Sequence, residues 1–192
     1  MMRDMISVLA GVCLTVVTAF SPVQAEEIHE DGQRVPFKVY MIRHAERDPG
    51  ANPPLNERGR ARAKLLAGLM ADSQVTAIYV TDFRRNRQTA RPLAERGGIP
   101  VHVLPKKLNS DGRACADYFM DNIVKKHSDG NILFIGNSKS GEKGMGNLQE
   151  IYRRMGGDTL PLTRYFDMYV FFIHPGRPAI IHHVMYGDRS EQ

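Results

Sequence analysis

The sequence is poor in cysteine, since Cys13 and Cys115 are its two examples among 192 residues. Cys13 lies in an N-terminal apolar segment that we expect to be removed, which leaves one thiol in the mature chain. One thiol cannot form an internal disulfide, so the fold must be stabilised by its core even in an oxidising compartment. Cys115 occupies an apolar helical position, where we expect a small buried hydrophobic residue rather than a nucleophile.

The sequence also lacks an apolar run as long as the roughly 20 residues that a transmembrane helix requires. The uncharged segment Met5–Phe20 has 16 residues and follows Arg3, and small residues lead up to Ala25. This layout predicts a signal peptide over residues 1–25, a periplasmic or secreted protein, and no stable membrane association after cleavage. An uncleaved N-terminal anchor is the alternative.

Neither sign of charge dominates, because the sequence has 26 lysines and arginines and 21 acidic residues, which give a net charge of +5. A basic balance can indicate nucleic-acid binding, but an exported protein seldom meets nucleic acid. We therefore expect a phosphorylated or acidic ligand, and no nucleic-acid partner.

Internal repeats, low-complexity segments and a second domain are absent from the sequence. Residues 26–34 are polar, and we expect them to be flexible, whereas residues 35–192 form the predicted domain. Short apolar runs alternate there with helical patterns. Strands are expected at 37–43, 77–80, 101–105 and 132–136, and helices at 57–70, 84–96, 112–127 and 146–155.

This alternation predicts an α/β fold, with a largely parallel sheet flanked by helices on both faces. Two further apolar runs, 168–174 and 179–187, flank a turn and predict a C-terminal β-hairpin. In such sheets ligands bind beyond the carboxyl ends of the strands, so the residues that follow each strand matter most.

Basic residues follow the first two predicted strands. Arg43 and His44 end the first strand, which places a fixed cation beside a nucleophile or proton carrier. Several arginines, Arg85 among them, follow the second strand where a helix begins, and such a cluster can form an anion pocket with free backbone N–H groups.

Taken together, VYMIRHAERDPGANPPLNERGRARA and IYVTDFRRNRQTARPLA resemble the histidine phosphatase superfamily, also called the phosphoglycerate mutase-like family. The resemblance extends over about residues 35–187. Its most specific features are the Arg43-His44 pair with Glu46, the helix entry Pro54-Leu55-Asn56-x-x-Gly59, and the string Arg85-x-x-Gln88-Thr89-Ala90.

The resemblance implies a two-step mechanism without a metal or another cofactor. His44 matches the histidine that attacks phosphorus and becomes phosphohistidine, which water then hydrolyses. Arg43 and Arg85 match the arginines that grip the phosphoryl oxygens, and Arg84 is the neighbouring candidate if the register shifts by one.

Other residues near these motifs have two interpretations each. Glu46 and Arg47 lie in the same loop, where they either orient His44 and contact substrate or form a local salt bridge. Asp111 is the candidate proton donor for the leaving group, and its ordinary alternative is to cap the following helix.

The fourth strand departs from the family pattern. The family normally has glycine-histidine at its end, whereas this chain has Gly136-Asn137-Ser138. Asn137 can donate a neutral hydrogen bond to a phosphate oxygen, but it carries no charge and cannot take a proton. Lys139 follows two residues later and either supplies the missing charge or faces solvent.

The sequence thus predicts an exported, metal-independent phosphatase that hydrolyses a phosphomonoester through His44, with activity reduced by Asn137. The expected partner is a phosphorylated small molecule or a phosphoprotein, because short links between strands leave an open pocket. The first alternative is an inactive homologue that binds a phosphorylated ligand or partner. The second is a basic surface protein that binds nucleic acid or anionic lipid.

Overall fold

The computed structural model describes residues 35–138, 146–160 and 164–188. The predicted signal peptide over residues 1–25 and the polar segment 26–34 lie outside these ranges. Within the described ranges, no helix is long and apolar enough to cross a membrane.

Six strands form one sheet in the order β3-β2-β4-β1-β5-β6. The pairs β2–β3, β2–β4 and β1–β4 are parallel, whereas β1–β5 and β5–β6 are antiparallel. The strand bounds are Phe37–Arg43 (β1), Val75–Val80 (β2), Val101–Val103 (β3), Asn131–Gly136 (β4), Asp167–Ile173 (β5) and Ile180–Met185 (β6).

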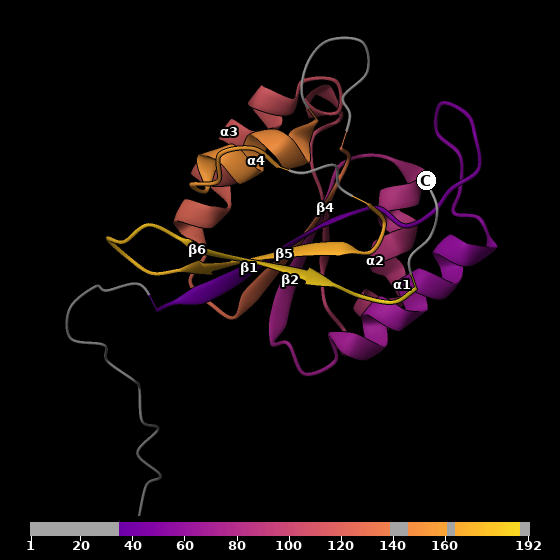
Figure 1. Ribbon diagram of the computed structural model, residues 1–192, viewed down its shortest axis with the longest axis horizontal. Helices are drawn as coiled ribbons and strands as arrows, with labels where there is room; N and C mark the ends of the chain where they lie inside the picture. The colour runs from indigo at the N-terminus through magenta and orange to yellow at the C-terminus, as the bar shows by residue number, and fades with distance from the viewer. Residues whose placement is uncertain (1–34, 139–145, 161–163, 189–192) are drawn as a thin grey trace, which may run out of the picture. The chain divides into compact units, whose positions relative to one another are not determined.

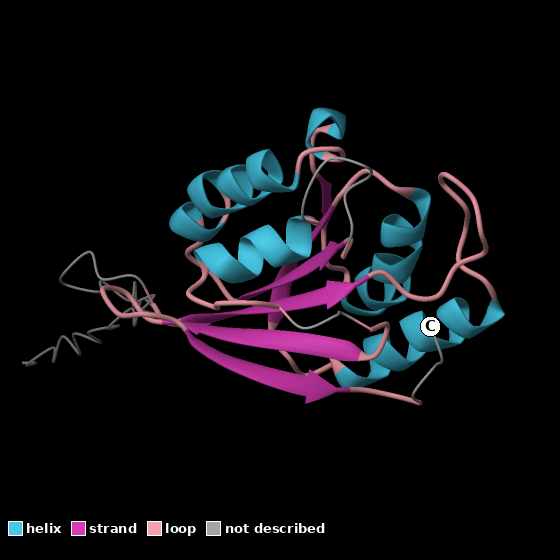
Figure 2. Cartoon of the chain, turned by 45° about the horizontal axis from the view of Figure 1, so that its top comes forward, coloured by secondary structure: helices cyan, strands magenta, loops and turns pink. Residues whose placement is uncertain are grey.

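Helices cover both faces of the sheet. Figure 1 shows α1 and α2 on one side of the strands and α3 and α4 on the other, and Figure 2 shows the strands fanning out between the two pairs. The helix bounds are Glu57–Leu69 (α1), Arg84–Gly97 (α2), Gly112–Asn122 (α3) and Asn147–Arg154 (α4), with 3₁₀ turns at Lys106–Leu108 and Val124–Lys126.

Two hydrophobic clusters fill the space between these layers. Leu66 of α1 and Leu93 of α2 pack with Ile42, while Phe119 of α3 and Leu148 of α4 pack in the cluster on the opposite face. The predicted α/β class, the parallel arrangement of the first four strands and the terminal hairpin are all confirmed.

The third helix is shorter than the expected 112–127, because α3 ends at Asn122. Ile123 caps this end and a 3₁₀ turn follows from Val124 to Lys126. Ile123 and Val124 are consecutive β-branched residues, which lose side-chain freedom in a helix, and both side chains are buried.

The start of α1 is fixed by two local contacts. The Asn56 side chain accepts a hydrogen bond from the backbone N–H of Gly59 at 2.9 Å, as expected for a cap. A Cβ on Gly59 would lie 2.0 Å from the carbonyl oxygen of Glu46, so this position requires glycine. The helix thus packs directly on the loop that follows β1.

The carboxyl ends of the central strands meet at one edge of the sheet. Arg43 lies opposite Gly136 in the β1–β4 register, and Val80 lies opposite Ile135 in the β2–β4 register. The loops that follow β1, β2 and β4 therefore emerge side by side, which brings together the residues singled out in the sequence.

Candidate active site

His44 is held at the end of β1 by backbone contacts on both sides. Its backbone N–H donates to the carbonyl of Gly136 at 3.1 Å, and its side chain is buried with 3% exposure. The ring nitrogen Nδ1 lies 2.8 Å from the carbonyl oxygen of Ala45. A carbonyl oxygen only accepts, so Nδ1 carries the proton and the Nε2 of the neutral ring keeps its lone pair.

The surroundings of His44 favour that neutral ring. Burial lowers the pKa of His44 to about 3, the hydrogen bond to Ala45 raises it in part, and the charges of Arg85, Arg43 and Arg47 lower it further. A histidine in this state has an available nucleophilic nitrogen at any pH near neutrality.

Arg85 lies in the first turn of α2 and is buried with 8% exposure. Its guanidinium lies 4.2 Å from the centroid of the Phe83 ring. Its Nη2 and Nε donate to the side-chain oxygen of Asn137 at 2.9 and 3.2 Å. Burial, followed by the charges of Arg47 and Arg43, lowers the pKa of Arg85 to about 10. Arg85 remains charged at neutral pH.

One edge of the Arg85 guanidinium has a donor without an acceptor among the described residues. Its Nη1 is buried and has no hydrogen-bond partner within the described residues. A buried N–H of a charged group costs free energy unless an acceptor reaches it. The structure therefore fits an anionic ligand at this atom.

Asn137 follows β4 and is buried in a polar network. Its amide Nδ2 donates to the hydroxyl of Thr81 at 2.9 Å, and its backbone N–H donates to the side chain of Asn147 at 2.8 Å. Thr81 also accepts from Asn86 at 2.5 Å. The predicted substrate-binding residue thus lies in the site, with its side-chain oxygen directed at Arg85.

Arg43 lies beside His44 and contacts an aromatic residue that the sequence analysis missed. The guanidinium lies 4.2 Å from the ring centroid of Tyr165, and Nη2 donates to the Tyr165 hydroxyl at 3.4 Å. The Tyr165 and His44 ring centroids are 5.8 Å apart. Tyr165 therefore forms part of the same site.

Arg47 contributes a third guanidinium near His44. Its Nη1 donates to the backbone carbonyls of Asp48 and Gly50 at 2.8 and 3.3 Å, which holds the side chain against its own loop. Its Nε is buried and has no hydrogen-bond partner in the part of the chain that the structure describes. Arg47 and Arg85 thus each have one buried nitrogen donor with no hydrogen-bond partner among the described residues.

Glu46 forms a salt bridge, but its partner is Arg62 of α1 and not a residue of its own loop. Both of its carboxylate oxygens accept from Arg62 of α1, at 2.7 to 2.9 Å, and both side chains are 6% exposed. Arg62 also donates to the backbone carbonyls of Tyr186 and Asp188. This pair joins the loop after β1, helix α1 and the residues that follow β6.

Asp111 and Lys139 are the two remaining predicted site residues. Asp111 caps α3 by accepting from the backbone N–H of Ala114 at 2.9 Å, so its ordinary alternative is observed. Its role as proton donor stays a prediction. Lys139 lies outside the described residues.

The motif Arg85-x-x-Gln88-Thr89-Ala90 on α2 also has a structural role. Gln88 accepts from the backbone N–H of Leu55 at 2.8 Å, and the Thr89 hydroxyl accepts from that of Ala45 at 3.0 Å. These side chains tie α2 to the loop after β1.

Cys115 is fully buried, and burial raises the pKa of its thiol to about 12, as expected for a structural residue.

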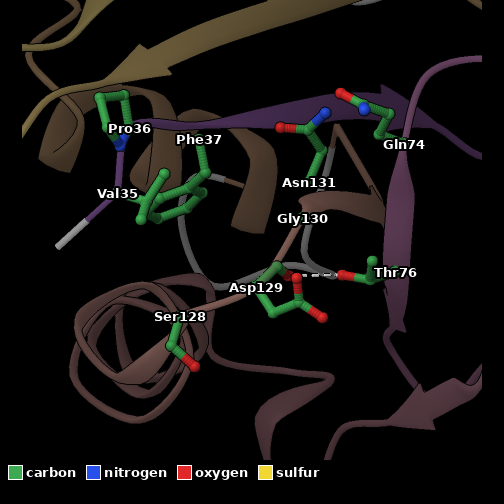
Figure 3. Close-up of a pocket in the computed structure, with 9 residues that line it drawn as sticks. All are labelled: Val35, Pro36, Phe37, Gln74, Thr76, Ser128, Asp129, Gly130 and Asn131. Atoms are coloured by element: carbon green, nitrogen blue, oxygen red, sulfur yellow. Dashed lines mark hydrogen bonds between the residues drawn. The ribbon is translucent and has the colours of Figure 1, made fainter. Parts of the chain in front are cut away.

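A cavity of about 410 Å³ lies at the opposite edge of the sheet, beside the amino ends of β1, β2 and β4 (Figure 3). The hydroxyl of Thr76 donates there to the carbonyl of Asp129, and the amide of Asn131 is bonded to Lys38 and Ser73. The nine residues that line the cavity include no arginine and no histidine, so it is separate from the His44 site.

The comparison with protein families agrees with this geometry. Residues 39–155 match the histidine phosphatase superfamily, branch 1, and this match covers more than half of the chain. The chain belongs to the histidine phosphatase superfamily. The predicted family is therefore confirmed.

Two curated relatives match part of the chain, and both are phosphatases by name. The adenosylcobalamin/alpha-ribazole phosphatase of Salmonella typhimurium is 29% identical over 101 residues, which are 48% of this chain and 46% of that protein. Phosphoserine phosphatase 1 of Hydrogenobacter thermophilus is 24% identical over 129 residues, or 62% and 61% of the two chains. The chain thus spans about half to three fifths of the length of these relatives.

Solved structures show the shared fold. The protein histidine phosphatase SixA complexed with tungstate aligns with a TM-score of 0.61 and 16% identity, over 78% of this chain and 97% of that one. A mycobacterial glucosyl-3-phosphoglycerate phosphatase in complex with inorganic phosphate aligns with a TM-score of 0.54 and 16% identity, over 78% and 96%.

Proposed function

We propose that this protein hydrolyses a phosphomonoester through a phosphohistidine intermediate on His44, without a metal. The observation that carries the proposal is the state of the His44 ring. Its Nδ1 donates to Ala45, so the Nε2 of the neutral ring has the lone pair that attack on phosphorus requires.

The proposed reaction has two displacements at phosphorus. In the first, Nε2 of His44 forms a bond to phosphorus, the bond from phosphorus to the ester oxygen breaks, and the leaving oxygen takes a proton. In the second, water attacks phosphorus, the bond to Nε2 breaks, and inorganic phosphate leaves. Asp111 remains the predicted proton donor.

The arginines supply the charge that this reaction needs. A phosphate monoester dianion fits a site with Arg43, Arg47 and Arg85 around a neutral histidine, and guanidinium groups bind phosphoryl oxygens in a bidentate way. Removing one such donor from a desolvated site costs about a hundredfold to a thousandfold in rate. We expect that loss for Arg43→Ala and for Arg85→Ala.

Asn137 favours a second candidate function. We infer that it stands where the family normally has its second histidine, so that position has a neutral amide in place of a group that can become charged. A site with fewer charges could still bind a phosphorylated ligand without turning it over. This noncatalytic binding protein is the alternative to the enzyme.

The substrate class is proposed as a phosphorylated small molecule or a phosphoprotein. Relatives named as an adenosylcobalamin/alpha-ribazole phosphatase and a phosphoserine phosphatase support a phosphatase without selecting a substrate. We further propose that the mature protein is exported, on the basis of the apolar segment before Ala25.

Turnover of p-nitrophenyl phosphate by the purified full chain, measured with and without EDTA, tests the proposal. We expect slow hydrolysis that EDTA does not abolish, an acid-labile phosphoryl group on the protein, and loss of both in His44→Ala. His182→Ala is the matched control, because His182 lies exposed on β6. Turnover that survives in His44→Ala would refute the mechanism. Phosphate binding without turnover or labelling would favour the noncatalytic alternative.

A further inference from the structure

We propose that Asn137 is a positioning residue that acts through Arg85 and does not bind the phosphoryl group itself. This inference rests on the proposed phosphate site, and it specifies what the neutral side chain of Asn137 does there.

The orientation of the Asn137 amide follows from the chemistry of its neighbour. A guanidinium has only hydrogen-bond donors, so the atom that faces Nε and Nη2 of Arg85 must be the amide oxygen. The amide nitrogen then points to Thr81, whose hydroxyl oxygen lies 2.9 Å away. One N–H of Asn137 is thereby used within the protein.

An amide suits this task better than a neutral imidazole. The amide oxygen has two lone pairs and accepts from both Nε and Nη2 of Arg85, whereas a neutral imidazole ring has one accepting nitrogen. Asn137 therefore holds one whole edge of the guanidinium and fixes its rotation.

Phe83 and Asn137 together leave one edge of Arg85 for a ligand. The Phe83 ring covers a face of the guanidinium at 4.2 Å, and the Asn137 oxygen covers the Nε–Nη2 edge. The remaining Nη1 is the buried atom with no partner among the described residues. Asn137 thus directs the Arg85 N–H that is available to an anion.

The Asn137 side chain is itself rigidly supported. Thr81 and Asn86 are fully buried, and Asn86 also donates to the carbonyl of Ile135 at 3.3 Å, which anchors the network to β4. The backbone N–H of Asn137 is bonded to Asn147 at the start of α4. A fixed acceptor of this kind can set the geometry of a long, flexible side chain.

A double-mutant cycle on phosphate binding separates the two roles of Asn137. The full chain is titrated calorimetrically with inorganic phosphate as wild type, Asn137→Ala, Arg85→Ala and the double variant. We expect Asn137→Ala to weaken binding about tenfold, and the double variant to bind within about twofold of Arg85→Ala because the role of Asn137 ends with Arg85. A full additional tenfold loss in the Arg85→Ala background would show direct contact with phosphate and overturn the inference.

Asn52→Ala is the control for this cycle. The Asn52 side chain accepts from the backbone N–H of Arg84 in the same first turn of α2, and within the described residues the Arg85 side chain donates to Asn137 and not to Asn52. We expect phosphate affinity within about twofold of wild type. A tenfold loss in this variant would assign the effect to the helix start in general and overturn the specific role of Asn137.

The Nε–H resonance of Arg85 in a phosphate-free NMR spectrum gives a readout that does not depend on activity. Slow exchange of this proton is expected in wild type and in Asn137→Asp, which keeps an oxygen acceptor, and its loss is expected in Asn137→Ala. If Asn137→Ala fails to fold, a folded Asn137→Asp that loses the signal overturns the inference. If the Arg85 Nε–H exchanges slowly in wild type and Asn137→Asp but not in Asn137→Ala, and the protein shows no turnover, the positioning role stands and only the proposed enzyme activity is refuted.

Discussion

Glu46 and Arg62 form a bidentate ion pair under the loop that carries His44. Nε of Arg62 lies 2.9 Å from each carboxylate oxygen, and Nη2 lies 2.7 Å from Oε1. Glu46 lies two residues after the proposed nucleophile His44. It therefore links the geometry of the site to the packing of α1.

Replacing Arg62 with alanine should destabilise the fold. Removal of Arg62 leaves the Glu46 carboxylate buried without its guanidinium partner, and breaking such a pair costs about 3–5 kcal/mol. Urea unfolding at neutral pH measures the loss. The exposed pair of Arg91 and Glu95 is the control, where Arg91→Ala should change stability by less than about 1 kcal/mol. Equal effects in both variants would contradict a structural role for Glu46.

Gly59→Ala should disturb the same loop from the side of α1. The new Cβ would lie 2.0 Å from the Glu46 carbonyl oxygen, so helix and loop must separate, at a cost of about 1–3 kcal/mol. Thermal unfolding tests this. Gly68→Ala in the same helix meets no atom within 4 Å and should stabilise the protein by about 0.5–1 kcal/mol. An unchanged thermal stability of Gly59→Ala would show that the loop moves aside easily.

Thr89→Val should slow phosphoryl transfer more than it alters substrate binding. The Thr89 hydroxyl accepts from the N–H of Ala45, and the carbonyl of Ala45 fixes the His44 ring. Valine keeps the shape but leaves that N–H unpaired, so we expect about a tenfold fall in kcat at a nearly constant KM. Thr89→Ser restores the hydroxyl and should restore the rate. A failure of serine to rescue would assign the loss to packing.

Much of the fold was predictable because its local patterns are strong. The alternation of apolar strands and amphipathic helices placed Arg43 and His44 at the carboxyl end of β1, and the observed strand ends there. Asn56 marked the start of α1, and the structure confirms its cap. These features depend on neighbours within a few positions along the chain.

Contacts between distant residues escaped the sequence analysis. Tyr165 lies 122 positions after Arg43, and no local pattern shows that its ring would cover that guanidinium. The orientation of Asn137 likewise depends on Arg85, which lies 52 positions away. The alternatives for Glu46 could not be separated for the same reason, since Arg62 lies on another element.

The buried state of His44 predicts an unusual pH dependence of stability. Its pKa is about 3 in the folded protein, against an ordinary value of 6.5. Between these values the unfolded chain binds the extra proton, so His44 makes the folding free energy less favourable as pH falls, by up to about 1.4 kcal/mol per pH unit. Above pH 6.5 both states are neutral at this residue and the effect vanishes.

Urea unfolding at pH 7.5 and pH 4.5 measures this effect when wild type is compared with His44→Gln. Glutamine cannot take a proton in this range, so the variant should lose roughly 2–3 kcal/mol less stability than wild type between the two values. Because the same pKa keeps Nε2 unprotonated, an NMR titration of the His44 ring should show no protonation down to about pH 4. Protonation of His44 near pH 6.5, or identical pH dependence in both proteins, would contradict the buried neutral nucleophile on which the proposed function depends.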